Sequence, residues 1–585
     1  MTRSRRRPLG WAIAAVVLAW VGVTAVQLVL ARADATAGRR AAERAKEMTS
    51  PDDVLGGRPL PMLRTARSRF SRAHTHLQSP FVAPVRLLPV VGRQVRAVDA
   101  LSSAATKVAG TGIEAVTSAR EVLDAPHRSG PQRIAVLRRL AVVAGRAERE
   151  LEGLSLGPRS ALIGPVASAH DELAKQVART RDGLGRGAAG ARSAADLLAG
   201  PRRYLILAAN NAEMRSGSGM FLSAGVMTTS GGTIDVGDLT STTDLALPAG
   251  AVPLSGDLAD RWGWLHPSQE WRNLGASPRF DVTAPLAARM WEARGGGPVD
   301  GVLALDVGAL RATLAVIGPV DVNGRHVTSD NVDELLLHQQ YVEHAEDPDQ
   351  ATRREELGQI ARAVVDAIQD RQWSVADMAR ELGAAARGRH ILAWSNRVRE
   401  QDAWRSAGVD GAVKADSVLV GILNRGGNKL DRFLQVDATL DIAAAGPTGA
   451  ASDKRGPGRE AVLRVALHNT VPPGEPQYVT GPEGDSGLAE GEYGGIVAVT
   501  LPGPVSHAGV QGYDTFAAVG RDGPSYVVAP AVRLARGASV TLEFRFTLPP
   551  QLRALRVEPS ARVPAVLWRF RGDRWTDAET HNVAW

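Results

Sequence analysis

Three arginines stand at positions where a protein can hold a phosphate group. Arg215 ends a strand-like run that begins at Tyr204, and Arg353 and Arg354 stand where a helix is expected to begin. In a mostly parallel sheet, loops at the carboxyl ends of the strands form the ligand crevice. Guanidinium groups brought there can bind phosphate or pyrophosphate through bidentate hydrogen bonds. The alternative is that each arginine pairs with a nearby glutamate and only stabilises a loop.

Other catalytic and binding motifs are missing from the chain. Gly217-Ser-Gly219 lacks the third glycine of a dinucleotide-binding turn, because Leu222 stands there. There is no nucleophile elbow, no Walker A sequence and no H-E-x-x-H. The chain has no cysteine, which excludes disulfides, thiolate metal sites and cysteine nucleophiles. A net charge of +7 over 585 residues, with both signs interspersed, predicts no nucleic-acid partner.

The amino terminus predicts a membrane anchor. The run from Trp11 to Leu30 is apolar and uncharged, and as a helix it is about 30 Å long, the thickness of a bilayer core. Four arginines precede it: Arg3, Arg5, Arg6 and Arg7. We therefore expect a cytoplasmic tail over 1–10, a single transmembrane helix over 11–31 and an extracytoplasmic remainder. A signal peptide cleaved near Ala31-Arg-Ala33 is the alternative, although the run is longer than the usual signal-peptide core.

Residues 32–200 predict a helical stalk or bundle. They are rich in Ala, Leu, Val and Arg, and apolar residues recur at helical spacing, as at Ile134, Leu137 and Leu140. The segment from Ser79 to Gly92 contains three prolines and cannot form one regular helix.

Residues 201–412 predict an α/β domain. Continuous apolar runs over 204–209 and 219–229 are typical of buried strands, with a further strand expected over 231–236. The run from Val299 to Asp306, the helical pattern after it and the apolar run over 318–322 form the strand–helix–strand unit of a parallel sheet. Asp306 is well placed to cap the helix that follows it. Helices are expected at 281–294, 307–316, 330–343, 353–370 and 375–387.

Residues 413–585 predict a different, all-β architecture. Short alternating apolar runs are separated by turns rich in Gly, Pro and Asp, which is the pattern of an antiparallel β-sandwich. In the run from Val540 to Leu548, every second residue is a large apolar one and the residues between them are polar. We interpret this region as a packing or interaction module rather than a catalytic one.

Several motifs resemble a known family of single-pass envelope proteins, common in actinobacteria, called domain of unknown function 4012. The resemblance extends from about Ser79 to about Pro549. It is carried by the runs Leu88-Pro-Val-Val-Gly92, Asn210-Asn-Ala-Glu-Met-Arg215, Gly301-Val-Leu-Ala-Leu-Asp306, Gly318-Pro-Val320, Gly426-Gly-Asn-Lys-Leu-Asp431 and His468-Asn-Thr-Val-Pro472. It implies an extracytoplasmic membrane protein and says little about chemistry.

The stretch from Arg215 to about Ile368 is also similar in order to the LytR-CpsA-Psr family. That resemblance implies an α/β/α sandwich that binds a polyprenyl pyrophosphate through arginines and uses a divalent cation, here Mg²⁺. The candidate ligand-binding residues are then Asn211, Arg215, Arg272, Arg353 and Arg354, and the candidate cation ligands are Asp238 and Asp306. The chain departs from the family's pattern, because Ser216-Gly-Ser follows Arg215 and Tyr341-Val-Glu-His344 replaces an Arg-x-Arg run.

Three functions remain open from the sequence. The leading hypothesis is a membrane-anchored envelope protein that binds or handles a cell-envelope glycopolymer or its polyprenyl-pyrophosphate carrier. The second is an active transferase that attaches such a polymer to the cell wall. The third is a structural protein that interacts with other envelope proteins. The residues alone do not decide whether the protein is an enzyme.

Overall fold

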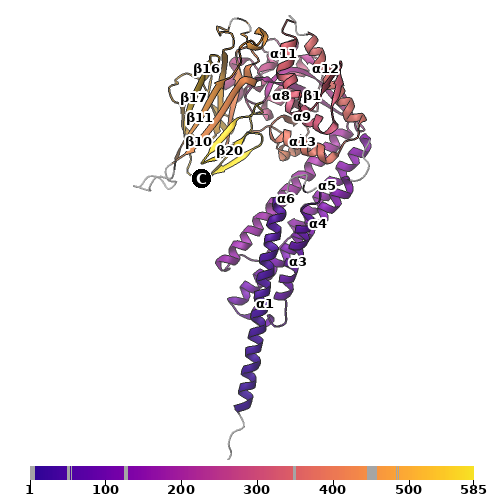
Figure 1. Ribbon diagram of the computed structural model, residues 1–585, viewed down its shortest axis with the longest axis vertical. Coiled ribbons are helices and arrows are strands. Elements are labelled where there is room, and N and C mark those ends of the chain that lie inside the picture. The colour runs from indigo at the N-terminus through magenta and orange to yellow at the C-terminus, as the bar shows by residue number, and fades with distance from the viewer. Residues whose placement is uncertain are drawn as a thin grey trace, which may run out of the picture. The chain divides into compact units, whose positions relative to one another are not determined.

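The computed structural model describes residues 7–48, 53, 56–123, 129–346, 351–443, 458–482, 484 and 486–585. The chain forms two compact units. The helical unit comprises Met1–His127 and Ala135–Ala195, and the sheet unit comprises Arg128–Ile134 and Asp196–Trp585. Figure 1 shows the helices and strands with the labels used below. The predicted tail over 1–10 lies mostly outside the described residues.

The helical unit is built from long helices. Its elements are α1 (Arg7–Glu47), α3 (Leu60–Leu77), the 3₁₀ turn η1 (Ala83–Leu87), α4 (Val91–Leu123), and most of α5 (Gly130–Glu152) and α6 (Gly164–Ala199). The predicted membrane helix and the first part of the stalk are therefore one continuous helix, α1. Among the described residues, α1 is the one helix long and apolar enough to cross a membrane. The segment with three prolines forms η1 and its flanking turns. This agrees with the prediction that it is not one regular helix, because proline has no backbone N–H to donate.

The first sheet of the sheet unit has the strand order β3-β2-β1-β5-β8, with β4 also paired to β2. Its strands are β1 (Arg202–Met214), β2 (Gly219–Ser230), β3 (Thr233–Val236), β4 (Thr240–Ser241), β5 (Gly301–Leu305) and β8 (Ile391–Ser395). Only β1 and β5 pair in parallel; the other pairs are antiparallel. The three strands expected between 204 and 236 are confirmed, whereas β8 was not predicted.

The expected parallel strand over 318–322 is wrong. Residues Val320–Val322 form β6, which pairs with β7 (Arg325–Val327) in a separate two-stranded hairpin. Asn323 and Gly324 form the two-residue turn and both have positive φ angles, 51° and 79°. An Asn-Gly turn of this kind favours immediate reversal of the chain, so the segment folds back on itself instead of joining the larger sheet.

Four predicted helices of the sheet unit lie close to their expected positions: α8 (Phe280–Ala293), α9 (Val307–Ile317), α12 (Ala351–Asp370) and α13 (Val375–Arg387). The helix expected over 330–343 is divided into α10 (Val332–Glu334) and α11 (Gln340–Glu343). Three further helices were not predicted: α7 (Gly256–Trp262), α14 (Val398–Ala407) and α15 (Gln477–Thr480). Short 3₁₀ turns occur at η2 (Gly263–Leu265), η3 (Trp271–Ala276) and η5 (Leu430–Phe433), and the π-helical turn η4 (Leu335–Gln339) joins α10 to α11.

Two further sheets occupy the carboxyl-terminal part of the sheet unit. One has the order β13-β17-β11-β10-β19-β20, and the other has the order β14-β15-β12-β9-β18-β21 with β16 also on β12. Their strands are β9 (Ser417–Asn424), β10 (Leu434–Ile442), β11 (Arg459–Asn469), β12 (Tyr493–Pro502), β13 (Ser506–Val510), β14 (Ala518–Asp522), β15 (Ser525–Ala529), β16 (Ala531–Leu534), β17 (Ser539–Leu548), β18 (Ala554–Val557), β19 (Leu567–Phe570), β20 (Asp573–Thr576) and β21 (His581–Ala584). Most pairs are antiparallel, but β10–β19 and β9–β18 are parallel.

The two carboxyl-terminal sheets share one hydrophobic core. Leu542, Phe544 and Phe546 of β17 enter it, which confirms the predicted alternation of that strand. Strand β9 is buried along its whole length. Its Val420 faces this core, and its Leu423 belongs to a second core shared with the first sheet and α8. The predicted α/β and all-β regions therefore pack as one unit rather than as separate bodies.

Candidate functional site

Two sequence motifs meet inside the sheet unit. The run from Asn210 to Arg215 forms the end of β1 and the turn after it, and the run from Gly426 to Asp431 follows β9. Asp431 accepts a hydrogen bond from the Met214 backbone N–H at 2.9 Å. More than 200 residues separate the two motifs in the chain, so this contact is made only by the tertiary fold.

A buried ion pair joins the motifs. Lys429 Nζ lies 3.1 Å from Glu213 Oε2, and the two side chains are only 5% and 8% exposed. The Lys429 ammonium also lies over the rings of Tyr341 and Tyr478, at 5.6 and 5.1 Å from their centroids. Burial disfavours the ammonium charge, but Glu213 and the tyrosines outweigh it and raise the pKa of Lys429 above its usual value. Lys429 therefore keeps its positive charge at neutral pH.

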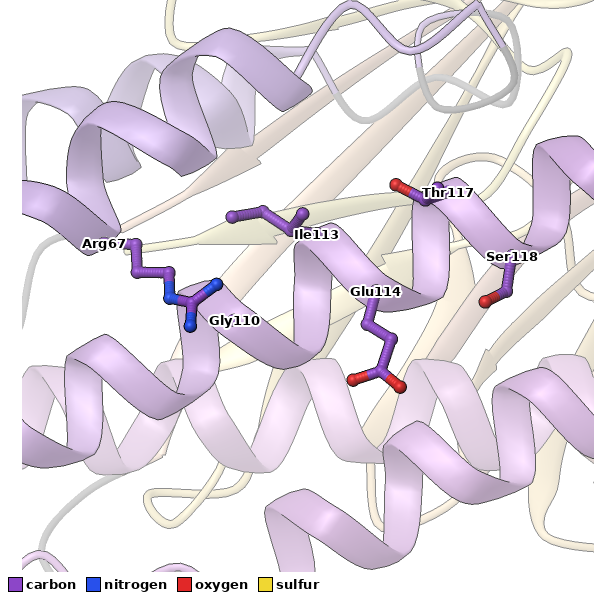
Figure 2. Close-up of a pocket in the computed structure, with 6 residues that line it drawn as sticks. All are labelled: Arg67, Gly110, Ile113, Glu114, Thr117 and Ser118. Carbon is purple, nitrogen blue, oxygen red and sulfur yellow. The ribbon is translucent and has the colours of Figure 1, made fainter.

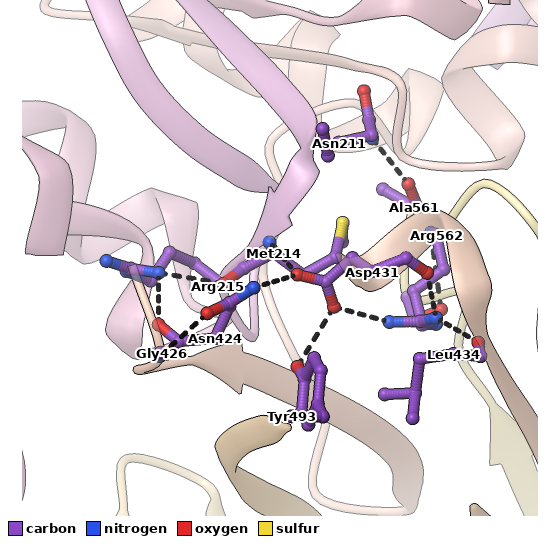
Figure 3. Close-up of polar contacts among 12 residues, drawn as sticks. Asn211, Met214, Arg215, Asn424, Gly426, Asp431, Leu434, Tyr493, Ala561 and Arg562 are labelled. Carbon is purple, nitrogen blue, oxygen red and sulfur yellow. Dashed lines mark hydrogen bonds and ion pairs between the residues drawn. The ribbon is translucent and has the colours of Figure 1, made fainter. Parts of the chain in front are cut away.

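Asp431 is the centre of a fully buried polar cluster (Figure 3). One carboxylate oxygen accepts from Tyr493 Oη at 3.0 Å and from Arg562 Nη1 at 3.1 Å. The other accepts from the Asn424 side chain at 2.9 Å as well as from the Met214 N–H. Burial, and secondarily the charge of Asp431, raises the pKa of Tyr493 well above its usual value, so Tyr493 stays a neutral donor.

Arg215 is buried and directed at protein oxygens rather than at solvent. Its guanidinium donates to the backbone carbonyls of Met214, Arg272 and Asn424 and to the side chain of Asn273, at 2.9 to 3.3 Å. Burial lowers the pKa of Arg215 to about 10, which leaves it charged at neutral pH. Arg215 thus clamps three chain segments together at the edge of the Asp431 cluster.

The carboxyl ends of the parallel strands β1 and β5 bring Asn211 and Asp306 together, as the fold argument predicts for adjacent parallel strands. Asn211 Nδ2 donates to Asp306 Oδ2 at 2.8 Å and to the Ala561 carbonyl at 2.8 Å. Asp306 also caps α9 by accepting from two backbone N–H groups, which confirms its predicted capping role. His390 Nδ1 lies 2.8 Å from the same carboxylate. Protein donors therefore surround Asp306.

Asp238 and Asp306 lie in different surroundings. The Asp238 side chain is fully exposed and lies 3.5 Å from Arg362, whereas Asp306 is buried at the start of α9. Within the described part of the chain, no group of three or more His, Asp or Glu side chains is placed to hold a metal ion.

Arg353 and Arg354 lie in the first turn of α12, close to their predicted place. Arg353 is buried, with its guanidinium carbon 4.9 Å from the centroid of the Tyr341 ring, the same ring that Lys429 faces. Arg354 is half-buried. Arg353 and the Lys429 of the buried ion pair therefore face the same tyrosine ring, whereas Arg215 contacts the backbone of Arg272.

A surface arginine pair, Arg272 and Arg425, lies where the buried cluster reaches solvent. Arg272 is 42% exposed by its side chain and forms an ion pair with Glu270 at 2.6 Å. Arg425 is exposed and faces the ring of Trp264 at 5.7 Å, and Trp264 is itself 47% exposed. In the described structure the Arg425 guanidinium has no carboxylate partner. Partial burial and the nearby charge of Arg272 lower the pKa of Arg425.

The buried cluster explains how this surface is positioned. Arg215 holds the backbone of Arg272 and the carbonyl of Asn424, the residue before Arg425. The side chain of Asn273, which Arg215 also contacts, donates to the Leu265 carbonyl at 2.8 Å in the turn that carries Trp264. The buried Arg215 and the half-buried Asn273 therefore fix all three segments that supply the exposed groups.

Sequence reasoning found part of this arrangement. It identified Arg215 and Arg272 as candidates, but it missed Arg425 and Trp264. Arg425 directly precedes the Gly426–Asp431 motif, so its position beside that motif could have identified it as a candidate. Arg562 and Tyr493 could not be identified from the sequence, because neither lies in a recognisable motif.

The helical unit also has a shallow depression, lined by Arg67, Gly110, Ile113, Glu114, Thr117 and Ser118 (Figure 2). It combines Arg67 of α3 and Glu114 of α4 with small and apolar residues of α4. It contains none of the candidate residues predicted from the sequence.

Comparison with known proteins gives one match. No curated protein and no solved structure matches the chain. The predicted resemblance to a family of unknown function is confirmed over 199–341, a segment that includes β1, β2, β5, Arg215 and Arg272. Residues 199–341 thus match the family described as Protein of unknown function (DUF4012).

Proposed function

We propose that the protein is a membrane-anchored binding protein of the cell envelope and that Arg272, Arg425 and Trp264 bind an anionic envelope glycopolymer or its polyprenyl-pyrophosphate carrier. The observation that carries the proposal is the exposed Arg425 guanidinium, which lies beside a second arginine and has no carboxylate partner among the described residues. Two neighbouring cations without full compensation favour an anion between them.

The chemistry of the three groups suits a phosphorylated glycan. A guanidinium binds phosphate oxygens through two parallel hydrogen bonds, and Arg272 can exchange Glu270 for such a ligand because this ion pair is partly exposed. The exposed indole of Trp264 supplies an apolar face beside the cations. The clamp formed by Arg215 holds these groups in place before the ligand arrives, which lowers the entropic cost of binding.

The proposal extends to the architecture and orientation. We propose that α1 crosses the membrane once with the amino terminus in the cytoplasm, supported by the arginines that precede its apolar run. We also propose that the region around β1, β2 and β5 is related to the LytR-CpsA-Psr fold and that the two carboxyl-terminal sheets form a β-sandwich. The mixed sheet with helices packed on it and the core shared by the two later sheets support this reading.

The binding test uses the full chain in lipid nanodiscs, titrated with a polyprenyl pyrophosphate with and without Mg²⁺ and followed by tryptophan fluorescence. The test variant is Arg425→Gln, and Arg553→Gln, at an exposed arginine before β18, is the matched control. Loss of a charged hydrogen bond costs about 1.5–3 kcal/mol, so Kd should rise by roughly 10- to 100-fold. Trp264→Phe should remove most of the fluorescence response.

Saturable binding weakened by Arg425→Gln and unchanged by Arg553→Gln would support the proposal. Equal binding by wild type and Arg425→Gln would refute it, whatever the absolute affinity. Arg215 is a poor choice for this test, because its substitution disrupts four internal hydrogen bonds and confuses binding with folding.

A further inference from the structure

The segment with three prolines in the helical unit exposes a group of large apolar side chains. Leu87 is 84% exposed, Val90 70%, Leu88 50%, Val91 49% and Phe81 46%. Four of them lie between α3 and α4, and Val91 is the first residue of α4. A group of large exposed apolar side chains this close together in the chain indicates an interaction surface rather than an ordinary water-facing loop.

The other face of the same segment is packed against the protein. Val82 is fully buried and belongs to a core with Ala31 of α1 and Val95 of α4, and Val85 packs beside it. Gly92 is essential to this packing, because a Cβ there would lie 2.3 Å from a backbone oxygen of η1. The segment therefore has a fixed conformation with one face inward and one apolar face outward.

The position of the segment along α1 identifies what the outward face meets. The Phe81 carbonyl accepts hydrogen bonds from Trp20 Nε1 at 3.1 Å and from Thr24 Oγ1 at 2.9 Å. Trp20 and Thr24 lie within the apolar stretch of α1 whose own side chains are exposed, such as Leu18 at 70% and Val29 at 66%. The apolar patch is thus level with the part of α1 suited to the bilayer interior. Figure 1 shows α1 extending past α3 and α4.

In a lipid environment each backbone N–H needs an internal acceptor, and much of the segment meets this requirement. Three of its residues are prolines and have no N–H. The N–H groups of Val82, Val85, Leu88 and Gly92 donate to carbonyls three or four residues earlier, at 2.9 to 3.1 Å.

Charged and polar groups border the patch. Arg86, the single charged residue between Ser79 and Gly92, forms an ion pair with Asp99 at 2.7 Å. His74 and Gln78 also contact Asp99, at 2.7 and 2.8 Å. This group neutralises the charge of Arg86 and is placed to lie at the headgroup level, where polar side chains at membrane boundaries collect.

We propose that the segment 79–92 inserts its exposed face, Phe81, Leu87, Leu88, Val90 and Val91, into the lipid bilayer beside α1. The helical unit is then held at the membrane by two elements, a spanning helix and a fixed apolar loop. Such a pair restricts the tilt and rotation of the unit, which a single helix alone leaves free. The inference requires α1 to lie in the membrane and is independent of the ligand proposed above.

The absence of cysteine makes a site-specific probe simple to introduce. The full chain is reconstituted in phosphatidylcholine vesicles as Leu87→Cys or Val90→Cys, each labelled with an environment-sensitive NBD fluorophore. Val21→Cys, at a 48% exposed position of the apolar stretch of α1, is the lipid reference. Val142→Cys, at a 67% exposed apolar position of α5, is the matched aqueous control. Nitroxide-labelled lipids and aqueous iodide serve as quenchers.

The proposal expects blue-shifted emission at positions 87 and 90, quenched by nitroxide lipids as at position 21 and protected from iodide. Iodide quenching equal to that at position 142 would overturn it. Blue-shifted emission that neither reagent quenches would also overturn it, because a protein surface would then cover the patch. If position 21 itself is not quenched by nitroxide lipids, α1 is not in the bilayer and the inference fails with it.

Discussion

The buried ion pair between Glu213 and Lys429 gives the most demanding test of the structure. Replacing Glu213 with Gln keeps the size and shape of the side chain but removes the charge that compensates Lys429. The ammonium, 5% exposed, must then either remain charged without its partner or lose its proton. Both choices destabilise the fold, because an uncompensated charge in a protein interior is costly.

The cost has a calculable ceiling. Neutralising a lysine of pKa 10.5 at pH 7 costs about 1.36 kcal/mol for each of 3.5 pH units, or about 5 kcal/mol. The rings of Tyr341 and Tyr478 stay in place and favour the cation by about 0.5–2 kcal/mol. We therefore expect Glu213→Gln to lower the free energy of unfolding of the sheet unit by about 3–4 kcal/mol. The double variant Glu213→Gln/Lys429→Met should lose less than this single variant.

The assay is urea unfolding of the full chain in detergent, followed by tryptophan fluorescence. Ten of the twelve tryptophans lie at or beyond Trp262, so the signal reports the sheet unit. If the variant folds with a neutral Lys429, its deficit should shrink by about 1.36 kcal/mol per pH unit as pH rises towards 10.5, because the unfolded lysine also loses its proton. A loss below about 1 kcal/mol, with additive single and double variants, would refute the buried ion pair.

Three further outcomes follow from the same reasoning. Asp431→Asn should destabilise the sheet unit by about 3–5 kcal/mol in the same urea assay, because it leaves the buried Arg562 without its counter-charge; a change within 1 kcal/mol would contradict the cluster. Burial disfavours the charged ring of His390, but Asp306 outweighs this effect and raises the pKa of His390 above 6.5. The ion pair between His390 and Asp306 therefore stabilises the fold fully below pH 6.5, and this stabilisation is lost as the pH rises through the raised pKa. His390→Gln should flatten that dependence in thermal unfolding between pH 6 and 8, and an unchanged slope would exclude His390 as its source. Gly92→Ala should lower the unfolding temperature of the helical unit, measured by circular dichroism, since its Cβ would lie 2.3 Å from a backbone oxygen; an unchanged temperature would show that the turn relaxes freely.

Local patterns were sufficient for many individual elements. Continuous apolar runs located β1 and β2, helical spacing located α8, α9 and α13, and strict alternation gave the inward face of β17. The capping role of Asp306 was also correct, because an N-cap depends on residues only two or three positions away. These features are set by periodicity and by short-range hydrogen bonds.

Strand pairing was predicted less well. The apolar run at β6 looks like a strand of the main sheet, but the Asn323-Gly324 turn directs it into its own hairpin. The edge strand β8 was not recognised as a strand. Whether a strand pairs in parallel or antiparallel depends on which distant segment covers each face of the sheet. The residues next to the strand in the sequence do not determine this pairing.

The sequence by itself determined the long apolar helix near the amino terminus, the kinds of elements along the chain and the two motifs that meet in the interior. Only the tertiary structure decided what these motifs do. Arg215 carries a charge that suits a ligand, yet it donates to the carbonyls of Met214, Arg272 and Asn424, and the exposed Arg425 is left for solvent. The physical reason is that a charged side chain binds the nearest acceptors that desolvation leaves unpaired. The carbonyls of Arg272 and Asn424 lie 57 and 209 residues away in the chain and become neighbours of Arg215 only when the sheets pack.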